Sequence, residues 1–155
     1  MRAPHLHATL VRLDGHGVLI RGASGTGKSS LAVSLLRRAE AAGREARLVA
    51  DDQVLVERRE ALAFGHAPAA LAGLIELRGV GILNLPFERE AQMTLVVDLS
   101  TRAAIERLPE PSFVEIAGVS LRRIHLPERD PAFGADALLT FLWSLPPNER
   151  GGKAG

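Results

Sequence analysis

Short apolar runs separated by turn residues dominate the first third of the chain. The runs 7–13 (HATLVRL) and 17–20 (GVLI) flank Asp14-Gly15, and this arrangement predicts a β-hairpin. Apolar residues then recur at helical spacing, which predicts a helix over 29–42. The run 47–50 (RLVA) predicts a further strand. Strand, glycine-rich loop, helix and strand in this order predict a βαβ unit with its loop at a carboxyl strand end.

The remaining two thirds of the chain are mainly strand-forming. The segment 74–85 is apolar but carries two glycines, so we expect a bent strand or a loop there and no helix. The run 93–99 (MTLVVDL) predicts a strand, and 113–126 predicts a hairpin. We expect a short helix over 101–108 and a more apolar helix over 135–145.

Length and composition favour a single globular domain. The 155 residues are 46% hydrophobic and 24% charged, which is ordinary for one soluble globular domain. We expect this domain over 1–145 and a disordered polar tail over 146–155. The net charge of +1 indicates neither a nucleic-acid partner nor a membrane partner. The absence of cysteine, of a signal peptide and of a long apolar run predicts a cytoplasmic location.

The stretch 22–29 (GASGTGKS) matches the phosphate-binding pattern G-x-x-x-x-G-K-[ST]. Its glycines let consecutive backbone N–H groups turn toward phosphate oxygens, and the following helix adds its positive N-terminal end. Lys28 would reach the β and γ phosphates, and the Ser29 hydroxyl would bind Mg²⁺. The sequence therefore predicts a P-loop domain that binds a purine nucleotide and Mg²⁺, while the motif leaves the type of reaction open. The predicted nucleotide-binding residues are Gly22, Ala23, Ser24, Gly25, Thr26, Gly27, Lys28 and Ser29.

Two consecutive aspartates, Asp51 and Asp52, follow the strand after the predicted helix. A carboxylate at such a strand end commonly anchors Mg²⁺ or its water in P-loop proteins. Because successive side chains point to opposite sides, one aspartate could serve the metal while the other meets an acceptor hydroxyl as a base. The alternative is that one of them only caps a helix or stabilises a turn.

The sequence pattern alone does not decide the roles of several other polar side chains. His7 begins a strand that would bring it near the glycine-rich loop, but a lone histidine is more often structural. Glu76 and Arg78 lie among apolar residues, so they predict either a buried ion pair or a carboxylate brought to a metal. Arg107 and Arg129 are either anion contacts or solvated side chains.

Three ordered segments resemble the catalytic domain of HPr kinase/phosphorylase: HATLV with GVLIRGASGTGKSSLA, then RLVADDQV, then GHAPAALAGLIELRGVGILNL. The resemblance is close over 4–99 and looser to 142. It implies a single α/β, P-loop-containing domain with a mixed sheet, similar to the C-terminal domain of that kinase and to the core of phosphoenolpyruvate carboxykinase. It also implies ATP-dependent phosphorylation of a serine on a small HPr-like phosphocarrier protein of the phosphotransferase system. Family members form hexamers, so the resemblance implies a homo-oligomer.

The resemblance also implies roles for individual residues. Asp52 would take the serine proton in the forward reaction and return it in the reverse reaction, and the segment 75–84 would act in both directions. The catalytic residues that it implies are His7, Lys28, Asp52 and Arg107. The magnesium ligands that it implies are Ser29, Asp51 and Glu76.

The chain departs from the family pattern in two places. It is expected to be the short form known from alphaproteobacteria, which lacks the family's N-terminal domain. At 127–134 it reads PERDPAFG, where the family has a loop linked to dephosphorylation, so reversal by phosphorolysis stays open. Two other functions also stay open: a P-loop kinase with a small-molecule acceptor, and a non-catalytic regulator that binds ATP.

Overall fold

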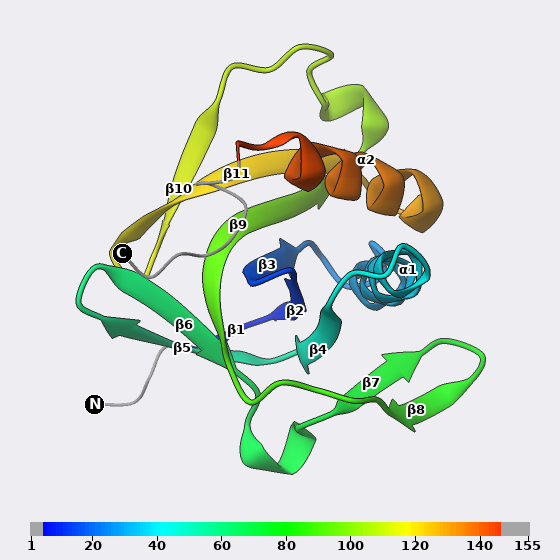
Figure 1. Ribbon diagram of the computed structural model, residues 1–155. Coiled ribbons are helices and arrows are strands. Elements are labelled where there is room, and N and C mark those ends of the chain that lie inside the picture. Colours follow the sequence, from blue (N-terminus) through cyan, green and yellow to red (C-terminus); the bar gives the residue numbers. More distant parts are fainter. Residues whose placement is uncertain (1–4, 147–155) are drawn as a thin grey trace.

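The computed structural model describes residues 5–146 and contains two helices packed on one face of a curved mixed sheet (Figure 1). The helices are α1 (Lys28–Ala41) and α2 (Pro131–Ser144), and single 3₁₀ turns cover Ala69–Leu71 and Arg102–Ala104. The strands are β1 (His5–Leu6), β2 (Ala8–Leu13), β3 (His16–Arg21), β4 (Ala46–Ala50), β5 (Val54–Arg59), β6 (Leu62–His66), β7 (Leu74–Leu77), β8 (Gly81–Asn84), β9 (Ala91–Ser100), β10 (Ser112–Ile116) and β11 (Val119–Pro127).

The main sheet runs in the order β1-β5-β6-β9-β3-β2-β4, and β11 with β10 extends it from β9. Strand β9 is parallel to both β3 and β11. The pairs β2–β3, β2–β4, β5–β6 and β6–β9 are antiparallel. The hairpin β7–β8 forms a separate two-stranded sheet, seen below α1 in Figure 1. The predicted α/β domain with a mixed sheet is therefore confirmed.

Two apolar clusters occupy the two faces of the sheet. Val18 and Ile20 of β3 belong to the cluster under α1 and α2, while Leu19 between them belongs to the cluster on the opposite face. All three side chains are fully buried. Alternation along a strand that is covered on both faces explains why 17–20 is apolar throughout. Strand β3 is thus a rigid base for the loop that follows it.

The predicted hairpin is confirmed, but the predicted βαβ unit needs a correction. Strand β2 pairs with β3 around the turn, with Leu13 opposite His16. The second strand of the expected unit, β4, pairs with β2 and not with β3, and both pairings are antiparallel. Strands β3 and β4 therefore run in the same direction with β2 between them. The hairpin forms between neighbours in sequence, so it occupies the position beside β3 that the crossover strand would otherwise take.

Strand predictions in the second half held, and one helix prediction did not. The segment 113–126 forms the predicted hairpin β10–β11. The segment 74–85 is not helical, as expected, but it forms the hairpin β7–β8 and not a single bent strand or a loop. The expected helix over 101–108 is wrong, because only one 3₁₀ turn forms there and the segment lies almost entirely exposed, without a core to pack on. The hairpin β5–β6 was not predicted, since half of β5 is charged and exposed and breaks the alternation.

Helix α2 begins at Pro131 and not at the predicted Ala135. The Asp130 side chain accepts a hydrogen bond from the backbone N–H of Phe133 (3.3 Å), and proline occupies the first turn. This cap and the fixed backbone angle of proline both favour a helix start at this point. The predicted tail over 146–155 lies outside the described residues from position 147 onward.

Stability should depend on pH through His16, the first residue of β3, whose side chain is buried. Its Nδ1 lies 2.7 Å from the Thr94 hydroxyl, and its Nε2 is buried without a hydrogen-bond partner among residues 5–146. Burial lowers the pKa of His16, and nearby Asp14 opposes this shift in part. The unfolded chain therefore binds this proton more readily than the folded protein. The free energy of unfolding should fall as pH drops below about 6.5, and the contribution of His16 should be complete above that value.

Urea unfolding between about pH 5 and 8 checks this prediction. The variant His16→Gln removes the titrating group, so its stability should depend less steeply on pH than that of the wild type over the lower half of this range. The other histidines titrate in both proteins, and the comparison cancels their contribution. Identical pH dependence in the two proteins would contradict the prediction.

Candidate active site

A cleft of about 690 Å³ opens at the sheet edge where β3 and β4 end. Residues from three separate parts of the chain line it: the glycine-rich loop, the aspartate pair after β4, and the hairpin β7–β8. Arg129 and His7 complete its wall. In sheets of this kind, ligands usually bind outside the carboxyl ends of the parallel strands, and the cleft has this position.

The glycine-rich loop has the geometry that its pattern predicts. Helix α1 begins directly after Gly27, which has a left-handed backbone (φ 93°) and provides no side-chain cap for the first helical N–H groups. These donors and the helix dipole are therefore free to meet an anion. At Gly22, a Cβ atom would lie 2.5 Å from Oγ1 of Thr26, whose hydroxyl donates to the carbonyl oxygen of Ala23 (2.7 Å). The close packing at this turn requires glycine.

Lys28 is buried inside the curve of this loop. Its Nζ donates to the carbonyl oxygens of Gly22 (2.8 Å) and Ala23 (3.2 Å). The ammonium group is thus held by main-chain atoms at the place where the pattern puts the phosphates. A compact charge on a flexible stem can exchange these carbonyl contacts for phosphate oxygens, which a planar guanidinium would do less easily.

Asp51 is the buried member of the aspartate pair and is hydrogen-bonded from three elements. Its Oδ1 accepts from the hydroxyls of Thr9 in β2 (2.8 Å) and Ser29 in α1 (2.7 Å). Its Oδ2 accepts from the backbone N–H of Glu76 in β7 (3.2 Å). Its position beside Ser29 on the cleft wall fits a magnesium anchor, and its three donors show why the carboxylate tolerates burial.

Asp52 points out of the protein and into the open part of the cleft. Its side chain is 62% exposed, and one carboxylate oxygen lies 3.1 Å from Nδ1 of His7. The backbone at Asp52 is left-handed (φ 69°), and its carbonyl oxygen accepts from the N–H of Ala8 (3.2 Å). Strand β4 ends at Ala50, so this turn, and not strand alternation, separates the two carboxylates. The expected division of the pair between an inner and an outer position is nevertheless present.

The remaining candidates are distributed unevenly around the cleft. Glu76 lines it and is exposed, as is Arg78, so the alternative of a buried ion pair between them does not apply. Arg107 lies exposed in the segment after the 3₁₀ turn and is not part of the cleft wall. Arg129 is part of the wall: its Nε donates to the carbonyl oxygen of Gly25 (3.1 Å), and its backbone N–H to that of Thr26 (2.9 Å).

Sequence patterns could not separate Arg129 from Arg107, because the contact of Arg129 with the loop is non-local. Strand β11 pairs with β9, and β9 pairs with β3, so the turn after β11 reaches the loop after β3. The backbone of Arg129 is left-handed (φ 54°), which is uncommon for a residue other than glycine. Such a conformation at a cleft is a feature of functional sites, but the roles of both arginines stay predictions.

The oxygen atoms in the cleft fit a magnesium ion that is shared with nucleotide phosphates. Mg²⁺ prefers oxygen ligands and is usually held by one or two carboxylates together with phosphates and water. Ser29 and Asp51 provide such oxygens side by side, and Glu76 lines the same cleft. Among residues 5–146, no group of three or more histidine, aspartate or glutamate side chains could hold a metal by itself.

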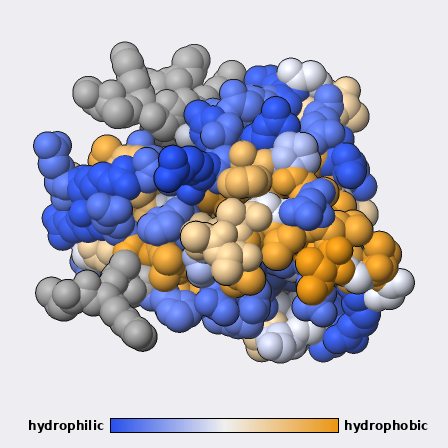
Figure 2. Space-filling model, turned by 90° about the horizontal axis from the view of Figure 1, so that it is seen from below, coloured by the Kyte–Doolittle hydropathy of each residue, from blue (hydrophilic) through white to orange (hydrophobic). Residues whose placement is uncertain are grey.

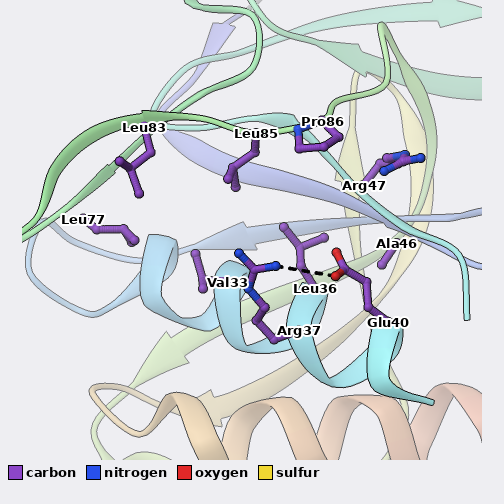
Figure 3. A pocket seen from close by; sticks show the side chains of 10 residues that line it. All are labelled: Val33, Leu36, Arg37, Glu40, Ala46, Arg47, Leu77, Leu83, Leu85 and Pro86. Atoms are coloured by element: carbon purple, nitrogen blue, oxygen red, sulfur yellow. Dashed lines mark hydrogen bonds and ion pairs between the residues drawn. The ribbon is translucent and has the colours of Figure 1, made fainter. Parts of the chain in front are cut away.

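A second cavity, of about 250 Å³, lies between α1 and the hairpin β7–β8 (Figure 3). Leu36, Leu83 and Leu85 line it, and Arg37 and Glu40, both from α1, form an ion pair at 3.5 Å on its helical wall. Its walls are mainly apolar and offer no glycine-rich loop for phosphates. The cleft at the ends of β3 and β4 is therefore the better candidate for a nucleotide site.

Residues 2–132 match the family described as the HPr Serine kinase C-terminal domain, and the chain therefore belongs to this family. The HPr kinase/phosphorylase of Halalkalibacterium halodurans is 34% identical over 136 residues, which cover 80% of this chain and 42% of that protein. That of Clostridium acetobutylicum is 41% identical over 81 residues, which cover 52% of this chain and 25% of that protein. The chain thus spans less than half the length of these relatives.

The solved structure of the Hpr(Ser) kinase/phosphatase from Coxiella burnetii is similar in fold. The TM-score is 0.76 at 23% identity, and the match covers 89% of this chain and 95% of that one. The shared fold supports the predicted α/β class, while the predicted likeness to phosphoenolpyruvate carboxykinase stays a prediction. Neither α-helix within residues 5–146 has the length and apolar character needed to cross a membrane.

The two neighbouring aspartates should differ sharply in their effect on stability. Asp51→Asn replaces a buried acceptor of three hydrogen bonds by an amide that presents its own N–H groups to some of those donors. We expect a loss of about 2 kcal/mol in the free energy of unfolding. Asp52→Asn should change stability by less than about 0.5 kcal/mol, because the residue is exposed and asparagine tolerates a left-handed backbone. Urea unfolding of both variants measures this difference, and equal losses would contradict the assignment.

Proposed function

We propose that the protein is an ATP-dependent serine kinase that phosphorylates a small HPr-like phosphocarrier protein of the phosphotransferase system. The observation that carries this proposal is the exposed Asp52–His7 pair, which faces the same cleft as the P-loop and the Asp51–Ser29 pair. A nucleotide-binding protein without catalysis would have no use for an exposed carboxylate oriented by a histidine at this place. Membership of the HPr serine kinase family supports the same acceptor.

In the proposed reaction, ATP lies with its phosphates in the loop 22–29. The loop N–H groups and the start of α1 bind phosphate oxygens, and Lys28 offsets the negative charge that develops on the β and γ phosphates. Ser29, Asp51 and Glu76 would hold the magnesium ion, which supplies further neutralisation of phosphate charge when bound. The hydrogen bond from Ser29 to Asp51 keeps two of these oxygens in place before the nucleotide arrives.

Asp52 would act as the base for the acceptor serine. The serine oxygen forms a bond to the γ phosphorus, its proton passes to the Asp52 carboxylate, and the bond to the leaving ADP breaks. His7 at 3.1 Å orients that carboxylate. Arg129, already in contact with the loop, is suited to a contact with the transferred group. Arg107, the arginine implied by family resemblance, would take part only if the segment 101–111 approaches the cleft.

Incubation with Mg-ATP and a purified HPr-like phosphocarrier, followed by intact-mass measurement of the acceptor, tests the kinase proposal. We expect a gain of one phosphate on a serine. Asp52→Asn should lower kcat about 10²–10⁴-fold and leave the affinity for Mg-ATP within about twofold, because the base acts on the acceptor and not on the nucleotide. The control is Asp136→Asn in α2, an exposed residue that pairs with Arg38 of α1 and does not line the cleft, and this variant should retain full activity.

Each alternative function predicts a different outcome of this experiment. Tight binding of Mg-ATP without transfer to any phosphocarrier would favour a non-catalytic regulator. Transfer to a small hydroxyl compound in preference to the protein would favour a metabolite kinase. Full phosphocarrier kinase activity in Asp52→Asn would contradict the assignment of the base.

We extend the proposal to the reverse reaction, phosphorolysis of the phosphoserine. An oxygen of inorganic phosphate attacks the phosphorus, the bond to the serine oxygen breaks, and Asp52 returns the proton, which gives serine and pyrophosphate. Arg129 is the arginine of the segment 127–134 and would help to bind the incoming phosphate.

Release of pyrophosphate from the phosphorylated carrier and phosphate measures this second reaction. Arg129→Gln should lower it at least about tenfold and should lower serine phosphorylation less, because only the reverse direction must bind free phosphate. Absence of pyrophosphate with the wild type would remove the reverse reaction from the proposal.

We also propose that the chain forms a homo-oligomer, the hexamer that family resemblance implies, through apolar surface near Leu85 and Phe141. Both residues are partly buried against the core, whereas Val80, Ile82 and Phe87 beside Leu85 are exposed. Figure 2 shows hydrophobic side chains gathered on the face of the molecule that carries the hairpin β7–β8. An apolar patch of this kind is suited to a protein contact, and light scattering of the purified chain measures its mass.

A further inference from the structure

Three charged side chains meet near the carboxyl ends of β3 and β9, one of them from the middle of the neighbouring strand β11. Arg21 is the last residue of β3, Asp98 is its register partner in β9, and Arg123 lies in β11, which pairs with β9. Their neighbours Leu19, Val96 and Leu121 belong to the apolar cluster on the face opposite α1 and α2. Because side chains alternate along a strand, the charged group lies on that face too.

Asp98 is bound by both arginines at once. The Nε and Nη2 atoms of Arg21 donate to its two carboxylate oxygens, each at 2.8 Å, and Nε of Arg123 lies 2.6 Å from Oδ2. The Asp98 side chain is only 16% exposed. Partial burial would by itself raise the pKa of Asp98, but the hydrogen bonds and charges of the two arginines outweigh it and hold the pKa below its ordinary value. The Asp98 carboxylate is therefore ionised and paired with both arginines.

Two of the three strands lead into segments that line the cleft, and the third leads into the segment of the candidate residue Arg107, outside the cleft wall. Arg21 is followed directly by Gly22, the first residue of the P-loop. Strand β9 leads into the segment that carries Arg107, and β11 leads into the turn that carries Arg129. The last two segments are also joined to one another, because the N–H of Glu128 donates to the carbonyl oxygen of Ser100 (2.8 Å). One carboxylate thus ties together the bases of all three.

We propose that Asp98 is a positioning residue that fixes the base of the P-loop through Arg21. Exposed ion pairs contribute little to stability, but this pair is bidentate, partly buried and shared with a second arginine, so it restrains the direction in which β3 ends. The restraint matters for Lys28, whose ammonium group is held by the carbonyl oxygen of Gly22, the residue next to Arg21. The relevance to nucleotide binding rests on the proposed function, whereas the restraint itself does not.

The variant Asp98→Asn removes the charge and keeps the shape of the side chain. In this variant, amide hydrogen exchange in 22–28 should be about tenfold faster than in the wild type, while exchange in α2 should stay unchanged. The dissociation constant for Mg-ATP should rise about tenfold, because a mobile loop must be ordered when the phosphates bind.

The control variant is Glu90→Gln. Glu90 also accepts two hydrogen bonds from one arginine, Arg59 (2.9 and 2.6 Å), on an exposed part of the same sheet away from the P-loop. Removal of the Glu90 charge should leave amide hydrogen exchange in 22–28 and the affinity for Mg-ATP unchanged. The second variant of the pair, Arg21→Lys, keeps the charge but cannot make the bidentate contact, and it should also speed exchange in 22–28.

The outcomes separate a positioning role from a purely structural one. If Asp98→Asn and Arg21→Lys lower the thermal midpoint but leave exchange in 22–28 as in the wild type, the positioning role is overturned. If Asp98→Asn does not fold, Arg21→Lys alone decides by the same measurement. If the wild type fails to bind Mg-ATP, the proposed function fails, while the exchange rates in 22–28 still decide the role of Asp98.

Discussion

The site is assembled around a buried carboxylate that has to be hydrogen-bonded. Asp51 is 8% exposed, and an ionised group at such a position is tolerated only when donors replace the water that it has lost. The three donors come from β2, α1 and β7, which are distant in sequence. The same contacts that satisfy Asp51 therefore fix the P-loop helix, the strand after His7 and the hairpin that carries Glu76. Burial of one charge organises the cleft.

The contrast between Asp51 and Asp52 shows how environment divides two identical side chains. The carboxylate oxygens of Asp51 accept hydrogen bonds from Thr9, from the backbone of Glu76 and from the Ser29 hydroxyl, which is suited to bind a metal. Asp52 turns outward through a left-handed backbone and has His7 as its neighbour. An exposed carboxylate with a single orienting partner remains accessible to an incoming hydroxyl, whereas a saturated one does not. The left-handed turn at Asp52 thus leaves one aspartate buried beside a candidate metal ligand and the other accessible to an incoming hydroxyl.

Local patterns allowed the parts of the site that are continuous in sequence to be predicted. The P-loop, the helix after it and the hairpin at Asp14 depend on neighbouring residues, whose spacing is visible in the sequence. The position of Arg129 against the loop and the pairing of Arg21 with Asp98 depend on which strands are adjacent in the sheet. No pattern within a single segment contains that information. The segment 101–108, wrongly predicted as a helix, has helical spacing of its apolar residues but no core to pack against. Tertiary packing supplies most of the stability of a short helix, so the helix does not form there.

The insertion of β2 between β3 and β4, which local patterns did not foresee, is what brings the catalytic candidates together. Because β2 is antiparallel to β3, it begins at the edge where β3 ends, and His7 immediately before it lies beside the P-loop. Because β4 is antiparallel to β2, it ends at the same edge and delivers both aspartates there. A simple βαβ unit would also bring the aspartates to this edge. In such a unit β2 would not lie next to β4, whereas the inserted strand lies between β3 and β4 and sets His7 beside Asp52, the proposed base.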